Sequence, residues 1–134
     1  MIALAAAAFI AGGTASSTAA TQTVVPRDCI HEAVKPHQII ITCADANFVL
    51  TALKWSHWAR KSAAGTGSAK INDCKPSCAE GHFHKYPVSV KLSSAHFCRS
   101  AGKTQFRRMR LTFTGKVPAG NKRTNSPSIA CPPK

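Results

Sequence analysis

Acidic side chains are scarce in this sequence: five Asp and Glu residues stand against 18 Lys and Arg, which gives a formal net charge of +13. A glycosidase normally needs two carboxylates in an acid and base pair, and no motif arranges these five in that way. The sequence also lacks a Gly-x-Ser-x-Gly elbow, a phosphate-binding Gly-rich loop and a His-Glu-x-x-His motif. No motif therefore supports hydrolytic chemistry.

Long apolar runs are also missing. Residues 1–11 are apolar, but Gly12 and Gly13 interrupt the run well before the roughly 20 residues that cross a bilayer. Residues 1–20 carry no charge and end in small side chains, as an export signal does, although its usual basic start is absent. We therefore expect a signal segment over 1–20, which is either truncated or read from a start codon assigned too far downstream. We also expect a secreted chain with no integral membrane span. The alternative, a buried N-terminal helix, lacks an amphipathic period.

Six cysteines lie beyond this segment: Cys29, Cys43, Cys74, Cys78, Cys98 and Cys131. An even number in a small exported domain predicts a disulfide framework, although six cysteines allow fifteen pairings. Sequence alone does not choose among these pairings; Cys74 with Cys78 is the first choice, because Pro76 makes a turn between them, and Cys29 with Cys43 and Cys98 with Cys131 are the candidates for the other two. The alternative is zinc bound by Cys74 and Cys78, but the tighter spacing and second matched pair of a zinc site are absent.

Short apolar segments separated by turns predict strands rather than helices. Two of them alternate with period two: Tyr86, Val88, Val90 and Leu92 share one face, and Met109, Leu111 and Phe113 share another. We expect strands over 36–43, 47–58, 66–72, 86–92 and 107–116, with a turn or irregular edge over 59–67 and loops over 72–81 and 93–104. The predicted fold is all-β, a small antiparallel sandwich or partly open barrel over 21–117. Residues 118–134 form a Pro-rich arm tethered by Cys131.

Two tryptophans, Trp55 and Trp58, stand three residues apart. On a regular strand they would face opposite ways, so we expect at most one of them to be exposed. An exposed indole could stack on a sugar or base, but a place in the core is the favoured interpretation.

The polar face of the strand over 107–116 is strongly basic, with Arg108, Arg110 and Lys116 pointing outward. If 86–92 is its antiparallel neighbour, Lys91 lies on the same face. Such a concentration of cations attracts polyanions, and an exported protein meets anionic polymers and surfaces at the cell envelope. These four residues are the candidate polyanion-binding site. The alternative is a solvated face that only provides solubility.

The densest group of other polar residues is Glu80-Gly81-His82-Phe83-His84-Lys85. On a strand, His82 and His84 share one face and could bind copper or zinc, with further ligands from His57, His96 or Glu80. The favoured interpretation is two solvated histidines, so no metal or other cofactor is assigned. A small secreted nuclease or other hydrolase using the His, Glu and Arg set is a further hypothesis, and no catalytic residue is assigned.

Two motifs stand out within 37–92: Trp-Ser-His-Trp at 55–58 and Cys-Lys-Pro-Ser-Cys-Ala-Glu-Gly at 74–81. With them, this segment resembles a family of small exported proteins from high-G+C Gram-positive bacteria that have no assigned activity. Cys29, Cys98 and Cys131 lie outside that pattern. The resemblance implies export and a β-rich fold, and it implies no catalytic residues.

Overall fold

The computed structural model describes residues 12–13 and 21–134, so the expected signal segment lies outside the described residues, apart from Gly12 and Gly13. The described chain contains strands and no helix, which confirms the predicted all-β class. Accordingly, these residues include no helix long and apolar enough to cross a membrane. The strands are β1 (Val25–Pro26), β2 (Glu32–Ala33), β3 (Ile39–Ile40), β4 (Phe48–Trp58), β5 (Ala63–Asn72), β6 (Phe83–Cys98), β7 (Lys103–Phe113) and β8 (Thr124–Asn125).

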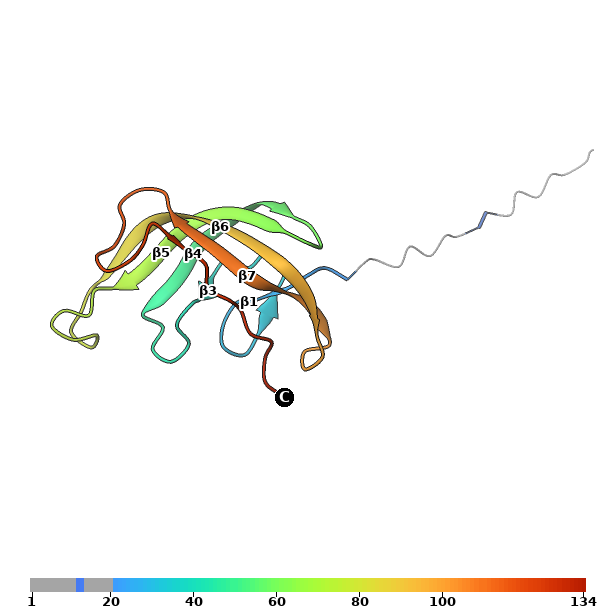
Figure 1. The fold of residues 1–134 in the computed structure, drawn as a ribbon, viewed down its shortest axis with the longest axis horizontal. Helices are drawn as coiled ribbons and strands as arrows, with labels where there is room; N and C mark the ends of the chain where they lie inside the picture. Colours follow the sequence, from blue (N-terminus) through green and yellow to red (C-terminus); the bar gives the residue numbers. More distant parts are fainter. Residues whose placement is uncertain (1–11, 14–20) are drawn as a thin grey trace, which may run out of the picture.

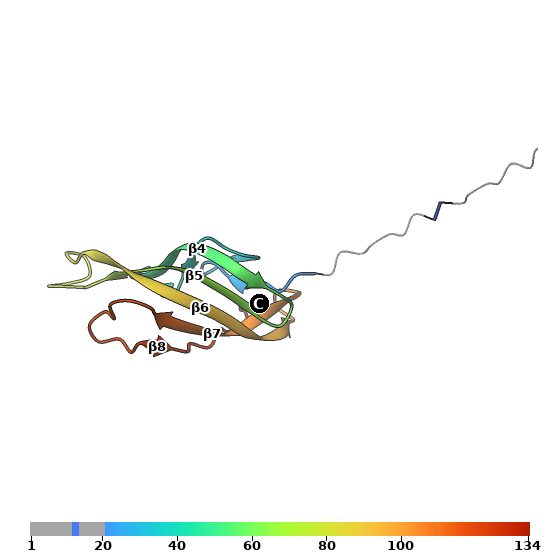
Figure 2. The same cartoon turned by 90° about the horizontal axis from the view of Figure 1, so that it is seen from above.

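Six of these strands form one antiparallel sheet in the order β3-β4-β5-β6-β7-β8. Each neighbour in the sheet is also the next strand along the chain, so the sheet is a meander of successive connections (Figure 1). The sheet curls strongly between β4 and β8 (Figure 2). The other two strands, β1 and β2, pair with each other in a separate short hairpin.

A short N-terminal segment ties the two sides of this curled sheet together. The backbone N–H of Val24 donates to the carbonyl of Thr104 at 3.0 Å, and the carbonyl of Val24 accepts the N–H of Phe106 at 3.0 Å. A little further on, the carbonyl of Arg27 accepts a 2.9 Å hydrogen bond from the N–H of Ile40 in β3. The sheet is therefore bridged into a partly open barrel, one of the two architectures that the sequence predicted.

The core is built from the inward side chains of β4 to β7. Across β6 and β7, Val88 pairs with Phe113, Val90 with Leu111 and Leu92 with Met109, and all six are buried. The period-two patterns of these segments therefore predicted the buried face correctly. Val25, Ile39, Leu50, Leu53, Ala63, Ala69 and Phe106 complete the cluster.

The strand β5 begins earlier than the sequence predicted. Residues 59–67 were expected to form a turn or irregular edge, but β5 already starts at Ala63. Gly65 and Gly67 lie within this range, and instead of forming a turn they allow the neighbouring strand to come close. A Cβ on Gly65 would lie 2.6 Å from the carbonyl oxygen of Lys54, and one on Gly67 would lie 2.7 Å from that of Thr51. These glycines stand opposite the register irregularity of β4, where the backbones come close together.

The predicted loop over 93–104 is mostly strand. β6 continues to Cys98 and β7 begins at Lys103, so the connection is only the turn over 99–102, with Gly102 at a φ of 65°. Conversely, β7 ends at Phe113 rather than at 116, and β3 is limited to Ile39–Ile40 within the predicted 36–43.

The expectation that the two tryptophans face opposite ways is wrong. Their ring centroids lie 4.8 Å apart in an edge-to-face arrangement, and Trp58 also contacts Phe106 at 5.5 Å. A register shift between Trp55 and His57 changes the alternation of β4, so both rings reach the same side. Both are half-buried against the core, and their indole N–H groups donate to the carbonyls of Pro36 and Thr23.

The three candidate disulfides are all present: Cys29–Cys43, Cys74–Cys78 and Cys98–Cys131. This number of disulfides in so small a domain indicates an oxidising environment. Cys131 anchors the C-terminal arm, which runs along the edge of β7. There the N–H of Met109 donates to Pro127 and the N–H of Ile129 donates to Arg107. The arm thus contributes β8 and extends the edge of the sheet.

Asp28 organises the turn of the β1–β2 hairpin. Its Oδ1 accepts the N–H groups of Ile30 at 2.8 Å and His31 at 2.7 Å, and these bonds lower the pKa of the carboxyl from 3.8 to about 2.

We expect Asp28→Asn to destabilise the protein near neutral pH and to have no effect at low pH. A carboxyl with a lowered folded-state pKa contributes stability above its unfolded pKa and loses it as the pH falls through the folded value. The stability difference between parent and variant should therefore shrink between about pH 4 and about pH 2. Urea unfolding of both proteins across this pH range measures the stability difference. The control is Glu80→Gln, because exposed Glu80 forms none of the ion pairs among the described residues. A difference that persists unchanged at low pH would contradict the assignment.

Candidate functional site

Three of the four predicted polyanion-binding residues meet on the outer face of the sheet. Lys91 of β6 lies directly opposite Arg110 of β7, and Arg108 lies opposite Ser93, two residues along. Each of these cations is exposed, because the alternation that buries Met109 and Leu111 turns its neighbours outward. Like charges directly opposite each other on a sheet repel.

The same row of the sheet continues into β5 and β4. Lys91 pairs with Ala64, and Ala64 pairs with His57, so a small side chain separates the cations from the imidazole. The His57 ring lies 3.0 Å from the hydroxyl of Ser62. Because the Ala64 side chain is small, the surface dips between the basic side chains and His57.

This dip is a shallow hollow of about 680 Å³, which we call the basic hollow. Its polar lining consists of His57, Ser62, Lys91, Ser93, Arg108, Arg110 and Ser126. Cations and hydroxyl groups both donate hydrogen bonds to anionic oxygens, so the lining suits a phosphate or carboxylate group. The sequence pattern identified the three cations but missed His57 and the serines, because only the strand register brings them together.

No carboxylate neutralises the basic hollow. Four ion pairs occur among the described residues, and they occupy Arg27, His31, His84 and Lys103. None of the five acidic residues lines the hollow. Its three cations therefore face solvent and one another rather than an internal counter-charge.

Three other basic residues near β7 lie outside the basic hollow. Lys116 is exposed but follows the end of β7, and the structure does not bring it to the basic hollow. Arg107 turns toward the C-terminal arm, where its guanidinium donates to the carbonyl of Ile129. Arg123 donates to the carbonyl of Phe113 at 2.7 Å. Arg107 and Arg123 therefore stabilise the fold. Composition alone could not distinguish such structural arginines from arginines that bind a ligand.

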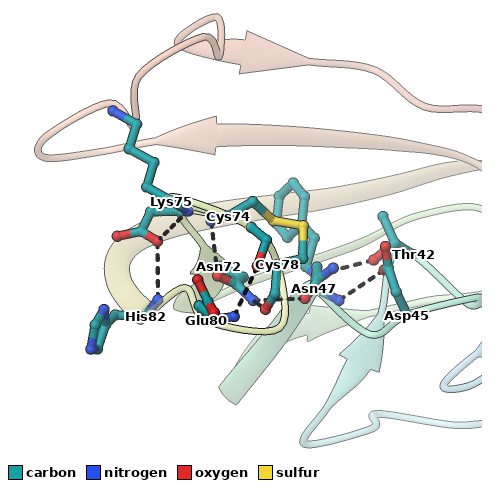
Figure 3. The surroundings of a disulfide bond; sticks show 12 residues. Thr42, Asp45, Asn47, Asn72, Cys74, Lys75, Cys78, Glu80 and His82 are labelled. Carbon is teal, nitrogen blue, oxygen red and sulfur yellow. Dashed lines mark hydrogen bonds between the residues drawn. A yellow bond between two sulfur atoms is a disulfide. The ribbon is translucent and has the colours of Figure 1, made fainter.

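The loop that carries the Cys74–Cys78 disulfide is ordered by amide hydrogen bonds (Figure 3). Asn72 is buried, and its side-chain N–H₂ donates to the carbonyl of Cys78 at 2.8 Å and to the amide oxygen of Asn47 at 3.0 Å. Its own oxygen accepts the N–H of Cys74 at 2.9 Å. These hydrogen bonds hold both ends of the loop between Cys74 and Cys78, so Asn72 has a structural role here.

The two histidines of the metal hypothesis have different surroundings. The His84 ring lies 3.0 Å from Asp73 Oδ2, whereas His82 offers its backbone N–H to Asp73 Oδ1, and the His82 ring points away from the disulfide (Figure 3). The N–H of His82, the ring of His84 and the N–H of Lys75 hold the pKa of Asp73 well below its usual range. Within residues 12–13 and 21–134, no three His, Cys, Asp or Glu side chains gather closely enough to hold a metal ion.

Comparison of this chain with protein-family models, curated proteins and solved structures finds no match.

Proposed function

We propose that this protein is exported and acts as a non-catalytic binding protein for an anionic polymer or surface at the cell envelope. The observation that carries the proposal is the basic hollow, where Lys91, Arg108 and Arg110 converge on one rigid sheet without a carboxylate partner. The three disulfides, the uncharged segment over 1–20 and the resemblance to small exported proteins support the location.

An anionic polymer would stabilise this face in two ways. Its charged groups would relieve the repulsion between Lys91 and Arg110, which lie directly opposite each other. The polymer would also release condensed counterions for each of its charges that a cation neutralises, which makes affinity strongly dependent on salt. With a net charge of +13, the whole molecule would in addition steer such a polymer toward it at low salt.

The test is the salt dependence of binding in the variant Arg108→Glu with Arg110→Glu. The probe is a labelled single-stranded oligonucleotide, followed by fluorescence anisotropy across a range of NaCl concentrations, and a purified teichoic acid serves as competitor. Single strands give a log–log slope of about 0.7 per phosphate neutralised, so the loss of two contacts should lower the slope by about 1.4. Affinity at low salt should fall at least tenfold, while the urea midpoint stays close to that of the parent.

The matched control is Arg99→Glu with Lys122→Glu, which has the same net charge but changes exposed residues outside the basic hollow. Equal weakening in both double variants would show that only total charge matters and would overturn the site. Parental affinity in the Arg108 and Arg110 variant would do the same. Shortening of the oligonucleotide or of an RNA probe during incubation would support the hydrolase hypothesis instead.

A further inference from the structure

A second hollow lies on the other side of β7, where the β1–β2 hairpin, β3 and the C-terminal arm meet. Its volume is about 330 Å³, at the lower end of the range for small-molecule sites. Most of its surface is apolar, with Val25, Ile39, Ile41, Met109 and Ile129 among the lining residues. We call it the apolar hollow.

One buried polar group in this lining lacks a partner. Gln105 is 0% exposed, and its side-chain N–H₂ donates to the carbonyl of Ala130 at 3.0 Å. Its Oε1 accepts no hydrogen bond, and it is the only buried side-chain polar atom of the described residues in that state. A buried acceptor without a donor is costly, so this oxygen marks the place where a ligand hydrogen-bond donor would be stabilised most.

The charged residues at the rim are already neutralised. Asp28 pairs with the guanidinium of Arg27 at 3.5 Å, and Glu32 pairs with Lys103 at 2.7 Å. The rim therefore offers no free charge of either sign to an ionic ligand. Ile30, in contrast, is 79% exposed there and adds apolar surface at the entrance.

We propose that the apolar hollow binds a small neutral hydrophobic alcohol or phenol. The hydrocarbon body would lie against Ile39, Met109 and Ile129, and the hydroxyl would donate to Oε1 of Gln105. Because that oxygen is buried, the adjoining part of the C-terminal arm must shift slightly to let the hydroxyl reach it. The site is independent of the basic hollow, because Met109 and the two arginines beside it point to opposite faces of β7.

The test compares para-butylphenol with butylbenzene, which has the same hydrocarbon body but no hydroxyl. Titrations of the full chain are followed by two-dimensional amide NMR spectra, with the side-chain amide of Gln105 and the backbone amide of Ile129 as reporters. We expect saturable binding of the phenol, about tenfold tighter than that of butylbenzene, which is the factor expected for about one net hydrogen bond. In Gln105→Leu the two compounds should bind within about threefold of each other.

Two further variants make the outcome decisive. Phe97→Ala removes an exposed aromatic ring outside the hollow and should leave binding unchanged, which excludes nonspecific adsorption. Ile39→Trp fills the hollow and should abolish binding of both compounds. Equal affinity of the parent for phenol and hydrocarbon would overturn the role of Gln105. No saturable binding of the phenol, or shifts confined to the basic hollow, would overturn the site itself, whatever the stability of the variants.

Discussion

Replacing Cys98 and Cys131 together with alanine should lower the free energy of unfolding by about 3–4 kcal/mol. This disulfide joins residues 33 positions apart, and the entropy lost by the unfolded chain on cross-linking rises with the length of the closed loop. The same bond holds the C-terminal arm, whose carbonyls at Ile129 and Ala130 accept hydrogen bonds from Arg107 and Gln105. Urea unfolding monitored by tryptophan fluorescence measures the change.

The matched control removes Cys74 and Cys78, which are only four positions apart. The loop-closure model gives about 2 kcal/mol for so short a loop. A larger loss in this control than in the Cys98 and Cys131 variant would contradict the ranking. That result would indicate that the cystine loop, with buried Asn72 at its base, determines stability more than the C-terminal arm does.

The Cys74–Cys78 disulfide and the central strands could be predicted because each depends on a short-range signal. Cys74 and Cys78 are close in sequence with Pro76 between them, so their pairing needs little knowledge of the fold. The inward side chains of β6 and β7 follow a period-two pattern over the stretch that forms the core. The same alternation correctly turned Lys91, Arg108 and Arg110 outward, which is the part of the candidate site that sequence could predict.

The rest depends on contacts between distant segments. Gly65 and Gly67 indicate a turn when taken alone, and only the close approach of β4 explains why a strand requires them. His57 lies at the basic hollow because of a register irregularity in β4, and no sequence pattern in this strand predicts that irregularity. The apolar hollow combines residues of the β1–β2 hairpin and β3 with residues of β7 and the C-terminal arm, so no local pattern could predict it.

The largest failure of simple alternation occurs near the end of the β6–β7 hairpin. Phe106 has the same parity as the outward Arg108 and Arg110, yet it is fully buried against Trp58. On the partner strand, Ser94 has a φ of 55°, a left-handed conformation that interrupts the regular pleat. Here Gln105 and Phe106 are adjacent in β7 and both fully buried, Gln105 against the C-terminal arm and Phe106 against Trp58.

Phe106→Ala should accordingly destabilise the protein by about 3–5 kcal/mol, the usual cost of deleting a buried aromatic side chain. The control is Phe97→Ala in the neighbouring strand, because that ring is 64% exposed and its loss should change stability by no more than about 0.5 kcal/mol. Urea unfolding of both variants decides between two views of the hairpin. If alternation continued unbroken through β7, Phe106 would lie outward beside Arg108, and the two substitutions would cost equally little. A large loss confined to Phe106→Ala is the result expected if this ring lies in the core against Trp58 while Arg108 and Arg110 stay on the basic face.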